Sequence, residues 1–484
     1  MKRNTLQTGA AGGPTALAAA VVCTVALLIT TAVLGGPRQL ETEADDARVG
    51  GDVAKQAEAE YGLVKDPELN DYVEKIGRRL AKRAPGYAFD YRFAIVDDTA
   101  PNAFALPGGY IFVSRGLLGL SNSEDELAGV LGHEIAHVAM RHAAAREGLG
   151  APSFLTPMKT LQIYSFSREL EHTADRVGQG LTAVAGYDPG GITDFLESLN
   201  SLEQLRLGYS RLPSFLSTHP GTINRVADTA QRASEIAWQR KPGFSGSRDE
   251  GHLRKIEGLV VGPTGHQGVF RGARFLHPDM GFTIRFPKGW DYHNTSRAVG
   301  AVSRKRNGQV FLEHAGPGKD PGKAADAWIE KGKDAGLRIS SRDSIKLVGR
   351  DALRLQGSVR GRGGSMRVHA TFIPWRDSIF RITGLSISMG KHEPFFINTA
   401  RSFRPMTREL LANVSELRLR LVKAQSSETL AELAKRSGTD WTPMELGVIN
   451  GLQATHRFKG GELVKITKAE AYKPEGVAWA GGRP

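Results

Sequence analysis

Apolar residues recur at helical spacing through the first half of this chain. In the segment 66–84 they repeat every three or four positions, which is the pattern of a helix with one buried face. Segments 91–98 and 108–116 are shorter, rich in β-branched and aromatic residues and bounded by turn residues, which predicts strands. The apolar positions of the first segment are Leu69, Tyr72, Val73, Ile76 and Leu80.

The strongest helical pattern covers residues 121–148. Ser123 is placed to cap the first turn, and Glu126, three positions later, completes a capping box. Glu124 and Asp125 favour the positive end of the helix dipole. Further helices are predicted over 167–184 and from Ile192 onward.

The pattern changes after a stretch rich in Gly, Ser and charge, which predicts a linker over 241–258. Beyond it, strand-like segments separated by turns surround one clear helix, which predicts an α+β accessory domain over 259–406. Residues 407–470 follow the order strand, helix, helix, strand, and residues 471–484 form a tail. The fold class is therefore α+β and multidomain, with a mainly helical domain and a small sheet over 37–240.

The bulk composition narrows the function. A length of 484 residues is typical of about two to four domains. The formal charge is +13, yet the chain has no zinc-finger spacing, no aromatic RNA-binding signature and no Lys/Arg block that tracks phosphates. We therefore expect a generally basic surface and no nucleic-acid partner. Cys23 is the one cysteine, so any metal must be held by His, Asp or Glu.

The N-terminus has the pattern of an export signal. Lys2 and Arg3 precede an apolar, uncharged run from Thr15 to Leu34, which Gly and Pro residues then interrupt. The run is long enough to cross a bilayer. Residues 1–36 are therefore expected to be a signal peptide or an N-terminal anchor, and the rest of the chain to lie in the periplasm or cell envelope.

His133, Glu134 and His137 form an H-E-x-x-H motif inside the strongest predicted helix. The two imidazoles leave one face a turn apart, and Glu134 can reach a water on the metal without binding the metal itself. The alternative is an ordinary solvated helix face or a pair of core histidines. That alternative is weakened because the surrounding residues are small or apolar, and buried polar groups without partners are costly.

A catalytic zinc needs a third protein ligand. His142 lies five residues beyond His137, too far round a continuing helix to face the same ion. The favoured donor is Glu171, with Asp175 one turn later to accept the spare N–H of a ligating histidine. His172 is a rival by chemistry, but it points about a quarter-turn away from Glu171.

Several ordered motifs resemble the HtpX-type zinc metallopeptidases, a gluzincin family that includes the CAAX prenyl endoprotease. The motifs lie within 49–233 and include 102–118, 123–142, 167–178 and 217–225. The resemblance implies a zincin-type peptidase domain. It also implies one Zn²⁺ per chain, with His133, His137 and Glu171 as ligands and Glu134 as the catalytic glutamate. An export signal with a soluble body is similar to the periplasmic members of that family.

A working hypothesis for the reaction follows. Glu134 takes a proton from a zinc-activated water and returns it to the leaving amine. His219 is the candidate donor to the developing oxyanion, with Arg225 as an anchor for its loop. The alternatives are an ordinary surface-loop histidine and a ligand of the zinc in a resting state. Segment 108–116 is expected to be an edge strand that holds an extended substrate by main-chain pairing, with a plain core strand as the alternative. Such pairing ignores most side chains, so we expect a zinc metalloendopeptidase that cleaves misfolded or unassembled envelope proteins, with the outer-membrane assembly machinery as a further partner.

The C-terminal segment 407–470 resembles a LysM module, and the accessory segment resembles PsbP-like α+β domains. In the LysM-like segment, Ser427 and Glu428 replace the usual Gly-Asp before Thr-Leu. Peptidoglycan is therefore a conditional partner. Two rival functions remain open: an envelope chaperone or binding protein with a structural zinc site, and a LysM-targeted peptidoglycan hydrolase.

Overall fold

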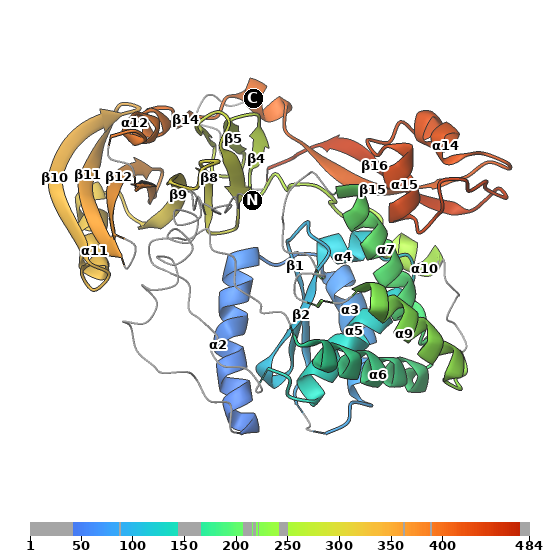
Figure 1. Ribbon diagram of the computed structural model, residues 1–484. Coiled ribbons are helices and arrows are strands. Elements are labelled where there is room, and N and C mark those ends of the chain that lie inside the picture. The colour runs from blue at the N-terminus through green and yellow to red at the C-terminus, as the bar shows by residue number, and fades with distance from the viewer. Residues whose placement is uncertain are drawn as a thin grey trace, which may run out of the picture.

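The computed structural model describes residues 42–86, 89–143, 166–206, 215, 219–220, 222–241, 250–361, 364–387 and 390–474. The helical part of the chain, a β-rich part and a C-terminal module can be followed in Figure 1 in blue to green, yellow to orange, and red. No helix in these ranges has the length and apolarity needed to cross a membrane. The predicted signal or anchor over 1–36 lies outside the described residues.

The helical part is built around one large apolar core. Asp66 caps its second helix through the N–H of Leu69 at 3.0 Å, with Pro67 at the first helical position. The elements are α2 (Glu43–Tyr61), α3 (Pro67–Ala81), β1 (Arg92–Val96), β2 (Ala103–Leu106), η1 (Pro107–Gly109), β3 (Tyr110–Ser114), α4 (Arg115–Leu120), α5 (Glu124–Ala139), α6 (Arg168–Ala185), α7 (Gly191–Arg206), α9 (Thr222–Glu235) and α10 (Glu250–Ile256).

The small sheet has the strand order β1-β3-β2. Strand β3 pairs in parallel with β1 and antiparallel with β2, so both of its edges are occupied. The prediction that 108–116 forms an edge strand is therefore wrong. Among the described strands, the edge that faces α5 is β2, since β2 contacts that helix. Strand order is set by pairing across the sheet and is not visible in the local pattern of one strand.

Helix α5 is shorter than its sequence pattern predicts. It ends at Ala139, and Arg141 takes a left-handed backbone conformation with φ of 50°. At its start, the hydroxyl of Ser123 accepts the N–H of Glu126 as expected. The carboxylate of Glu126 accepts from the N–H of Asn122 at 3.0 Å, so the predicted reciprocal capping box is only half formed.

Helices α5 and α6 lie unusually close together at a pair of glycines. A Cβ added to Gly178 would stand 2.8 Å from the backbone nitrogen of His133. A Cβ on Gly132 would stand 3.0 Å from the carbonyl oxygen of Gly178. A Cβ at Gly178 would force the helices apart, and one at Gly132 would be tight. The close approach brings side chains of the two helices within reach of one ion.

The predicted linker over 241–258 is wrong in its second half. Residues 250–256 form α10, and Leu253 and Ile256 belong to the large apolar core. The sequence pattern of α10 is too short to predict a helix, because seven residues with two apolar positions three apart resemble a polar linker.

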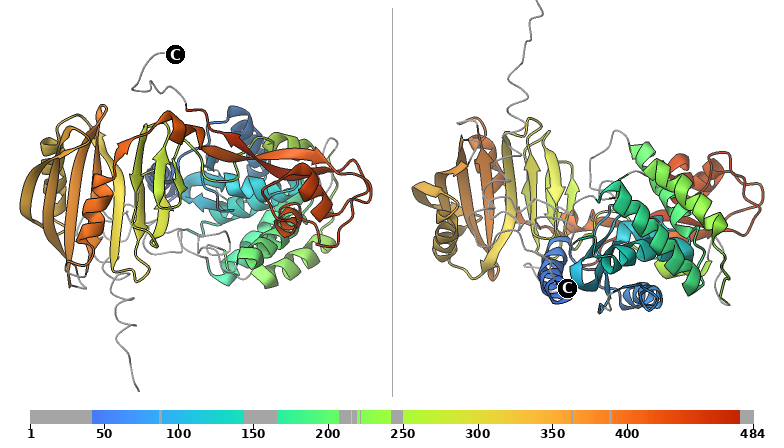
Figure 2. Two further views of the ribbon diagram at one scale, coloured as in Figure 1. Left: turned by 90° about the horizontal axis from the view of Figure 1, so that it is seen from above. Right: turned by 60° about the horizontal axis from the view of Figure 1, so that its bottom comes forward.

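The accessory part consists of two antiparallel sheets, which stand side by side in Figure 2. The seven-stranded sheet has the order β10-β11-β12-β13-β9-β8-β7, and the four-stranded sheet has the order β14-β6-β5-β4. The elements are β4 (Val269–Arg271), β5 (Arg274–His277), β6 (Phe282–Arg285), β7 (Asp291–Asn294), β8 (Ala298–Val302), β9 (Gly308–Pro317), α11 (Pro321–Lys333), β10 (Leu337–Leu347), β11 (Arg350–Gly361), β12 (Gly364–Trp375), β13 (Ser378–Ser386), α12 (Glu393–Arg401), β14 (Arg404–Pro405) and α13 (Arg408–Ala412).

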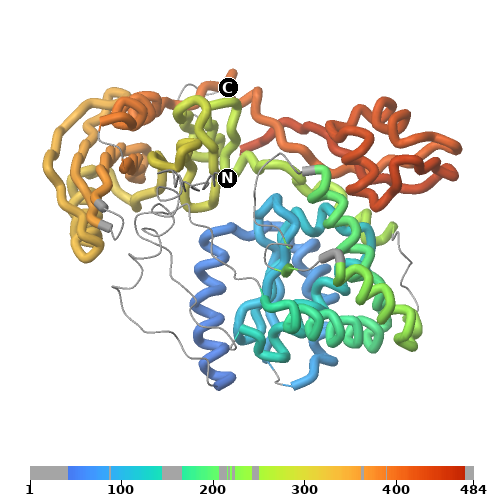
Figure 3. Tube along the Cα trace, in the orientation of Figure 1, coloured from blue at the N-terminus to red at the C-terminus, as the bar shows by residue number. Residues whose placement is uncertain are grey.

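The C-terminal module has the predicted order of elements: β15 (Ser415–Lys423), α14 (Leu430–Ser437), α15 (Pro443–Ile449) and β16 (Leu463–Ala471). Figure 3 shows the module lying over α7, which α15 contacts. Leu419 and Leu463 join the large core of the helical part. Lys465 is fully buried, and its Nζ donates to the carbonyls of Gly119, Leu120 and Ser121 at 3.0, 2.9 and 2.9 Å. The module is thereby packed onto the segment that leads into α5.

Candidate metal centre

Four side chains from three parts of the chain converge on one buried point. His133 and His137 leave α5, Glu171 comes from the first turn of α6, and His219 comes from the segment before α9. One ligand atom from each lies within 4.8 Å of the other three. None of the four residues is more than 2 % exposed. The structure thus brings together the three predicted ligands and adds His219 to them.

The separations are those of ligands around one small ion. Nε2 of His133 lies 3.0 Å from Nε2 of His137 and 3.2 Å from Nδ1 of His219. The carboxylate of Glu171 lies 3.4 Å from the first of these nitrogens and 3.5 Å from the second. Its distance to Nδ1 of His219 is 3.0 Å. Ligand atoms about 2.0–2.1 Å from a tetrahedral zinc lie roughly 3.3 Å apart, so these donors fit Zn²⁺ in kind and in spacing.

A buried ion pair holds His133 in place. Its Nδ1 lies 2.8 Å from Oδ1 of Asp175, the contact expected from the four-residue spacing after Glu171. Arg225 grips the same carboxylate with two hydrogen bonds of 2.8 and 2.7 Å. Arg225 also lies 2.9 Å from Glu171 and donates to the carbonyl of His219 at 3.3 Å. One guanidinium therefore ties the α6 carboxylates to the His219 segment.

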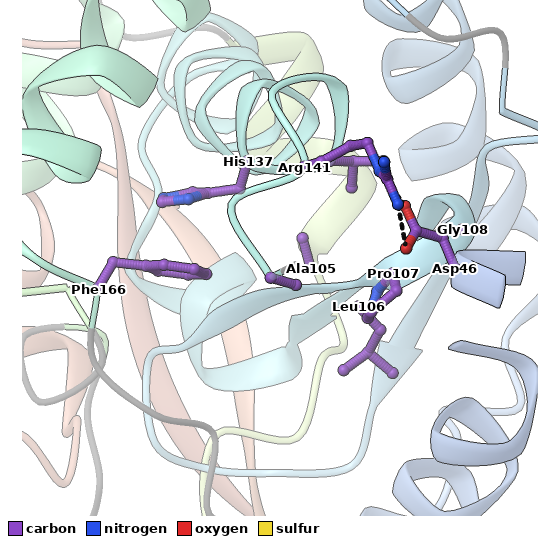
Figure 4. Close-up of a pocket in the computed structure, with 10 residues that line it drawn as sticks. Asp46, Ala105, Leu106, Pro107, Gly108, His137, Arg141 and Phe166 are labelled. Carbon is purple, nitrogen blue, oxygen red and sulfur yellow. Dashed lines mark hydrogen bonds and ion pairs between the residues drawn. The ribbon is translucent and has the colours of Figure 1, made fainter. Parts of the chain in front are cut away.

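His137 is held on its other side by His142 and Phe166. Figure 4 shows Phe166 beside it. Its Nδ1 lies 2.9 Å from Nδ1 of His142, and its ring stacks on Phe166 with centroids 3.9 Å apart. His142 can reach this position because the helix has already ended and Arg141 turns the chain back. Two hydrogen bonds from Arg141 to Asp46 of α2, 2.6 and 3.0 Å long, fix that turn.

Sequence reasoning missed this role of His142. It placed His142 on a continuing helix, where a residue five positions on faces elsewhere. The available signal was the change to larger, polar residues after Ala139, which is also consistent with a longer helix. The stacking of Phe166 depends on the tertiary fold and had no local signal.

Glu134 is the one member of the cluster whose carboxylate is left without a hydrogen bond. Both of its oxygens are buried and unpartnered, and Nε2 of His219 is 3.4 Å away. Burial raises the pKa of Glu134 above its ordinary value. A buried carboxylate without hydrogen-bond donors lowers the stability of the fold. The unpartnered state is expected of a group that exchanges a proton with a bound water or substrate.

Three of the converging side chains have shifted pKa values, and the shifts differ in direction. Burial raises the pKa of Glu171, but His219 and the hydrogen bonds with the other two histidines outweigh it and hold that pKa far below its usual range. Burial lowers the pKa of His133, whereas its contacts with Asp175 and Glu171 raise it to about 9. Burial dominates for His137 and lowers its pKa.

His172 lies outside the cluster. Its Nδ1 is 3.3 Å from Asp228, and its side chain is 40 % exposed. The rival third ligand is thus not among the converging donors. His219, by contrast, stacks on Phe215 with ring centroids 4.2 Å apart and is held within the donor set. The sequence predicts that His219 lies beside the reacting carbonyl. The structure places His219 nearer to the metal ligands.

Two helix-borne imidazoles, a carboxylate from a second helix and an unpartnered glutamate beside them define a metallopeptidase centre of the zinc metalloendopeptidase class. Residues 67–156 and 145–233 match Peptidase family M48. The matched segment 67–233, which carries His133, Glu134, His137, Glu171 and His219, is similar to that family.

Curated proteins similar to this chain are proteases of bacteria and mitochondria. The "Beta-barrel assembly-enhancing protease" of Escherichia coli (strain K12) is 30 % identical over 241 residues, which are 44 % of this chain and 48 % of that protein. The "Mitochondrial metalloendopeptidase OMA1" of Schizosaccharomyces pombe is 30 % identical over 218 residues, covering 40 % and 63 %. The chain therefore spans about half the length of the curated relatives it matches.

Among solved structures, the cyanobacterial PsbP of Synechocystis sp. PCC 6803 covers 30 % of this chain and 98 % of that protein, at 14 % identity and a TM-score of 0.24. A score of that size does not establish a shared fold. The resemblance of the accessory part to PsbP-like domains, like that of the C-terminal module to LysM, stays a prediction.

Proposed function

We propose that this protein is a zinc-dependent metalloendopeptidase of the cell envelope that cleaves misfolded or unassembled proteins. The observation that carries the proposal is the spacing of His133, His137 and Glu171, whose nitrogen and oxygen atoms lie 3.0 to 3.5 Å apart with unpartnered Glu134 beside them. The match of this segment to M48 peptidases supports it independently.

Zinc bound to these residues would acidify a water and polarise the scissile carbonyl. The carboxylate of Glu134 accepts the proton of the attacking water and returns it to the leaving amine. Its raised pKa suits both halves of that exchange. Asp175 keeps the proton of His133 on Nδ1, so that Nε2 presents its lone pair to the metal.

His219 supports a resting state in this proposal. Its Nδ1 lies among the donor atoms, where it would complete a four-ligand set and leave no place for water. Activity then requires the His219 segment to withdraw, after which its imidazole is placed to donate to the developing oxyanion. Arg225, which holds the carbonyl of His219, would set how readily that segment moves.

Substrate binding falls to β2 instead of β3. The pocket in Figure 4 is lined by Ala105 and Leu106 of β2 together with His137 and Phe166. Main-chain pairing along this edge would hold an extended segment across the metal centre. Because the pairing uses backbone groups, unfolded proteins are the substrate class that the site favours.

The envelope location rests on the export-like pattern of residues 1–36 and on the similarity to a beta-barrel assembly-enhancing protease. That protein's name associates it with beta-barrel assembly. As part of the proposal, the outer-membrane assembly machinery is a partner of this chain. The comparisons give no support to peptidoglycan as a partner.

A structural zinc site in an envelope chaperone is the less favoured function. A structural site is closed by its ligands and has no use for a carboxylate base. Here Glu134 is buried beside the ligands with neither oxygen hydrogen-bonded. That cost is explained by catalysis and is unexplained by a purely structural role.

The test is cleavage of unfolded casein by the purified, zinc-loaded protein. We expect Glu134→Gln to lower the rate by at least about 100-fold while zinc content stays unchanged. The matched control is Glu68→Gln, at an exposed position on α3, which should retain the rate. Equal rates for wild type and Glu134→Gln would sink the proposal.

A further inference from the structure

A second cleft lies where the C-terminal module meets α7, about 10 Å along α5 from the metal ligands by the rise of two helical turns. Its volume is about 870 Å³, which is in the range of ligand-binding sites. One wall carries Asn122, Glu126, Asp194 and Glu197, and the facing wall belongs to α15 and the turn after it.

The walls are chemically unlike. Three carboxylates line the first wall, and none of the described residues that line the cleft is Lys, Arg or His. Burial raises the pKa of Glu126, so the negative charge of this wall lies chiefly on Asp194 and Glu197. It stands out in a chain whose formal charge is +13. The second wall carries apolar side chains beside Asn450 and Gln453: Met444 is 60 % exposed there, and Val448 and Leu452 also line it.

An unpartnered buried group points independently to a ligand. Asn122 is 4 % exposed and lines the cleft, and its amide donates to the carbonyl of Leu120. Its Oδ1 is buried and has no hydrogen-bond partner. Buried side-chain acceptors are nearly always satisfied. An acceptor left open beside three carboxylates fits a donor that comes from another molecule.

The cleft is shaped for an organic cation more than for a metal ion. Among the described residues, the one group of His, Cys, Asp and Glu side chains that converges tightly enough for a metal is the centre on α5 and α6. The cleft carboxylates are spread along α5 and α7 instead. A Lys or Arg side chain matches that layout, because its aliphatic stem can lie on Met444 while its charged head meets the carboxylates.

Asp194 and Glu197, the two exposed carboxylates of the cleft, have no Lys, Arg or His beside them among the described lining residues. Partial desolvation by the surrounding protein, together with neighbouring Glu197, Asp188 and Asp125, raises the pKa of exposed Asp194 to about 6. The ammonium of Lys465 is near Glu126, but it is already held by three carbonyls of the α4 end. A bound cation would relieve the mutual repulsion of these acidic groups.

We propose that this cleft binds a Lys or Arg side chain, with an apolar neighbour, from an extended segment of a partner polypeptide. If the peptidase function proposed above holds, the cleft is an exosite that retains basic segments of a substrate near the metal centre. The binding itself does not depend on that function.

The test measures binding without cleavage, in the Glu134→Gln background. The probe is a fluorescein-labelled hexapeptide of alternating Leu and Lys, with a Leu/Glu hexapeptide of the same length as its counterpart. Fluorescence anisotropy is recorded with Asp194→Asn/Glu197→Gln and with Glu330→Gln/Asp351→Asn. The second pair removes the same charge from exposed positions on the accessory part.

We expect the Leu/Lys peptide to bind and the cleft double variant to raise its Kd by at least about tenfold. The control pair should change the Kd less than about twofold. Met444→Ala should weaken binding by a smaller factor, because it shortens the apolar wall. Asp194 and Glu197 are exposed, so the variants should fold, and melting curves check this.

Three results would overturn the proposal: no binding of the Leu/Lys peptide, equal Kd values for the parent and the cleft variant, or equally tight binding of the Leu/Glu peptide. Failure of the peptidase proposal has a different signature. The wild-type protein, which has Glu134, would then fail to cleave casein, whatever the binding measurement shows.

Discussion

The two ends of α5 hold two buried polar clusters whose charges are met in different ways. At the C-terminal end, surrounding histidines hold the pKa of Glu171 far below its usual range although burial acts to raise it. At the N-terminal end, burial raises the pKa of Glu126, and the Oδ1 of Asn122 has no partner. The metal-end cluster surrounds its carboxylates with histidines and Arg225, whereas Asp194 and Glu197 at the other end have no Lys, Arg or His beside them among the described residues that line the cleft.

The difference shows how a buried charge can serve two purposes. A carboxylate that is fully hydrogen-bonded and paired keeps one geometry, which a metal ligand needs. A carboxylate without an ion-pair partner attracts a cation from another molecule. We therefore assign chemistry to the first cluster and recognition to the second, and the following variants test that contrast.

The largest effect is expected for Arg225→Met. Arg225 is 1 % exposed and pairs with Asp175 and Glu171, so its loss leaves buried carboxylates without a countercharge. We expect the free energy of unfolding to fall by about 3–5 kcal/mol in urea denaturation. Arg254→Met, at an exposed position, is the control and should change stability by less than about 0.5 kcal/mol. Equal, small effects for both variants would show that the ion pairs of Arg225 do not stabilise the metal centre.

The close approach of α5 and α6 is tested by Gly178→Ala. Its Cβ would meet the backbone of His133 at 2.8 Å, so the helices must separate. We expect a loss of about 1–3 kcal/mol in stability together with weaker zinc binding. Gly180→Ala on the same helix meets nothing within 4 Å and should stabilise the protein by about 0.5–1 kcal/mol. Opposite signs for the two variants are the predicted outcome, and a stabilising Gly178→Ala contradicts the packing argument.

His142 is a positioning residue for His137. Replacing it with Phe keeps the ring packing but removes the contact at 2.9 Å. We expect the zinc Kd to rise about 10–100-fold, measured by competition with a chelator. His172→Phe, outside the cluster, should leave it unchanged. Partial rescue by His142→Gln would separate hydrogen bonding from packing, and an unchanged Kd for His142→Phe argues against the role.

The smallest effect concerns the N-terminal cluster and depends on pH. The folded-state pKa of Asp194 is about 6, above the ordinary 3.8, so the folded protein holds this proton more tightly than the unfolded chain. The stability that this gives is fully present below pH ~4 and is lost as pH rises through about 6. The free energy of unfolding of Asp194→Asn relative to wild type should therefore rise between pH 4 and pH 7. The rise should be less than about 1 kcal/mol, since the group is accessible to solvent. A difference that does not vary with pH contradicts the raised pKa.

The metal end was largely predictable from the sequence, because its signals are local. His133 and His137 stand one helical turn apart, as do Glu171 and Asp175, and helix geometry alone puts each pair on one face. The entry of His219 into the donor set was less visible. It lies 48 residues beyond Glu171 along the chain, and only the tertiary fold brings it back.

The features that sequence reasoning got wrong are set by contacts between distant segments. The position of β3 between β1 and β2 depends on pairing across the sheet. The early end of α5 depends on Arg141 reaching Asp46 of α2. The cleft at the other end needs the C-terminal module docked on α7, which no local pattern of Asn122 or Asp194 foretells.

The most direct test is a zinc anomalous difference map from crystals of the Glu134→Gln protein. The account predicts one strong peak within bonding distance of Nε2 of His133, Nε2 of His137 and a carboxylate oxygen of Glu171. A peak elsewhere, or none at this position in zinc-loaded protein, would contradict it.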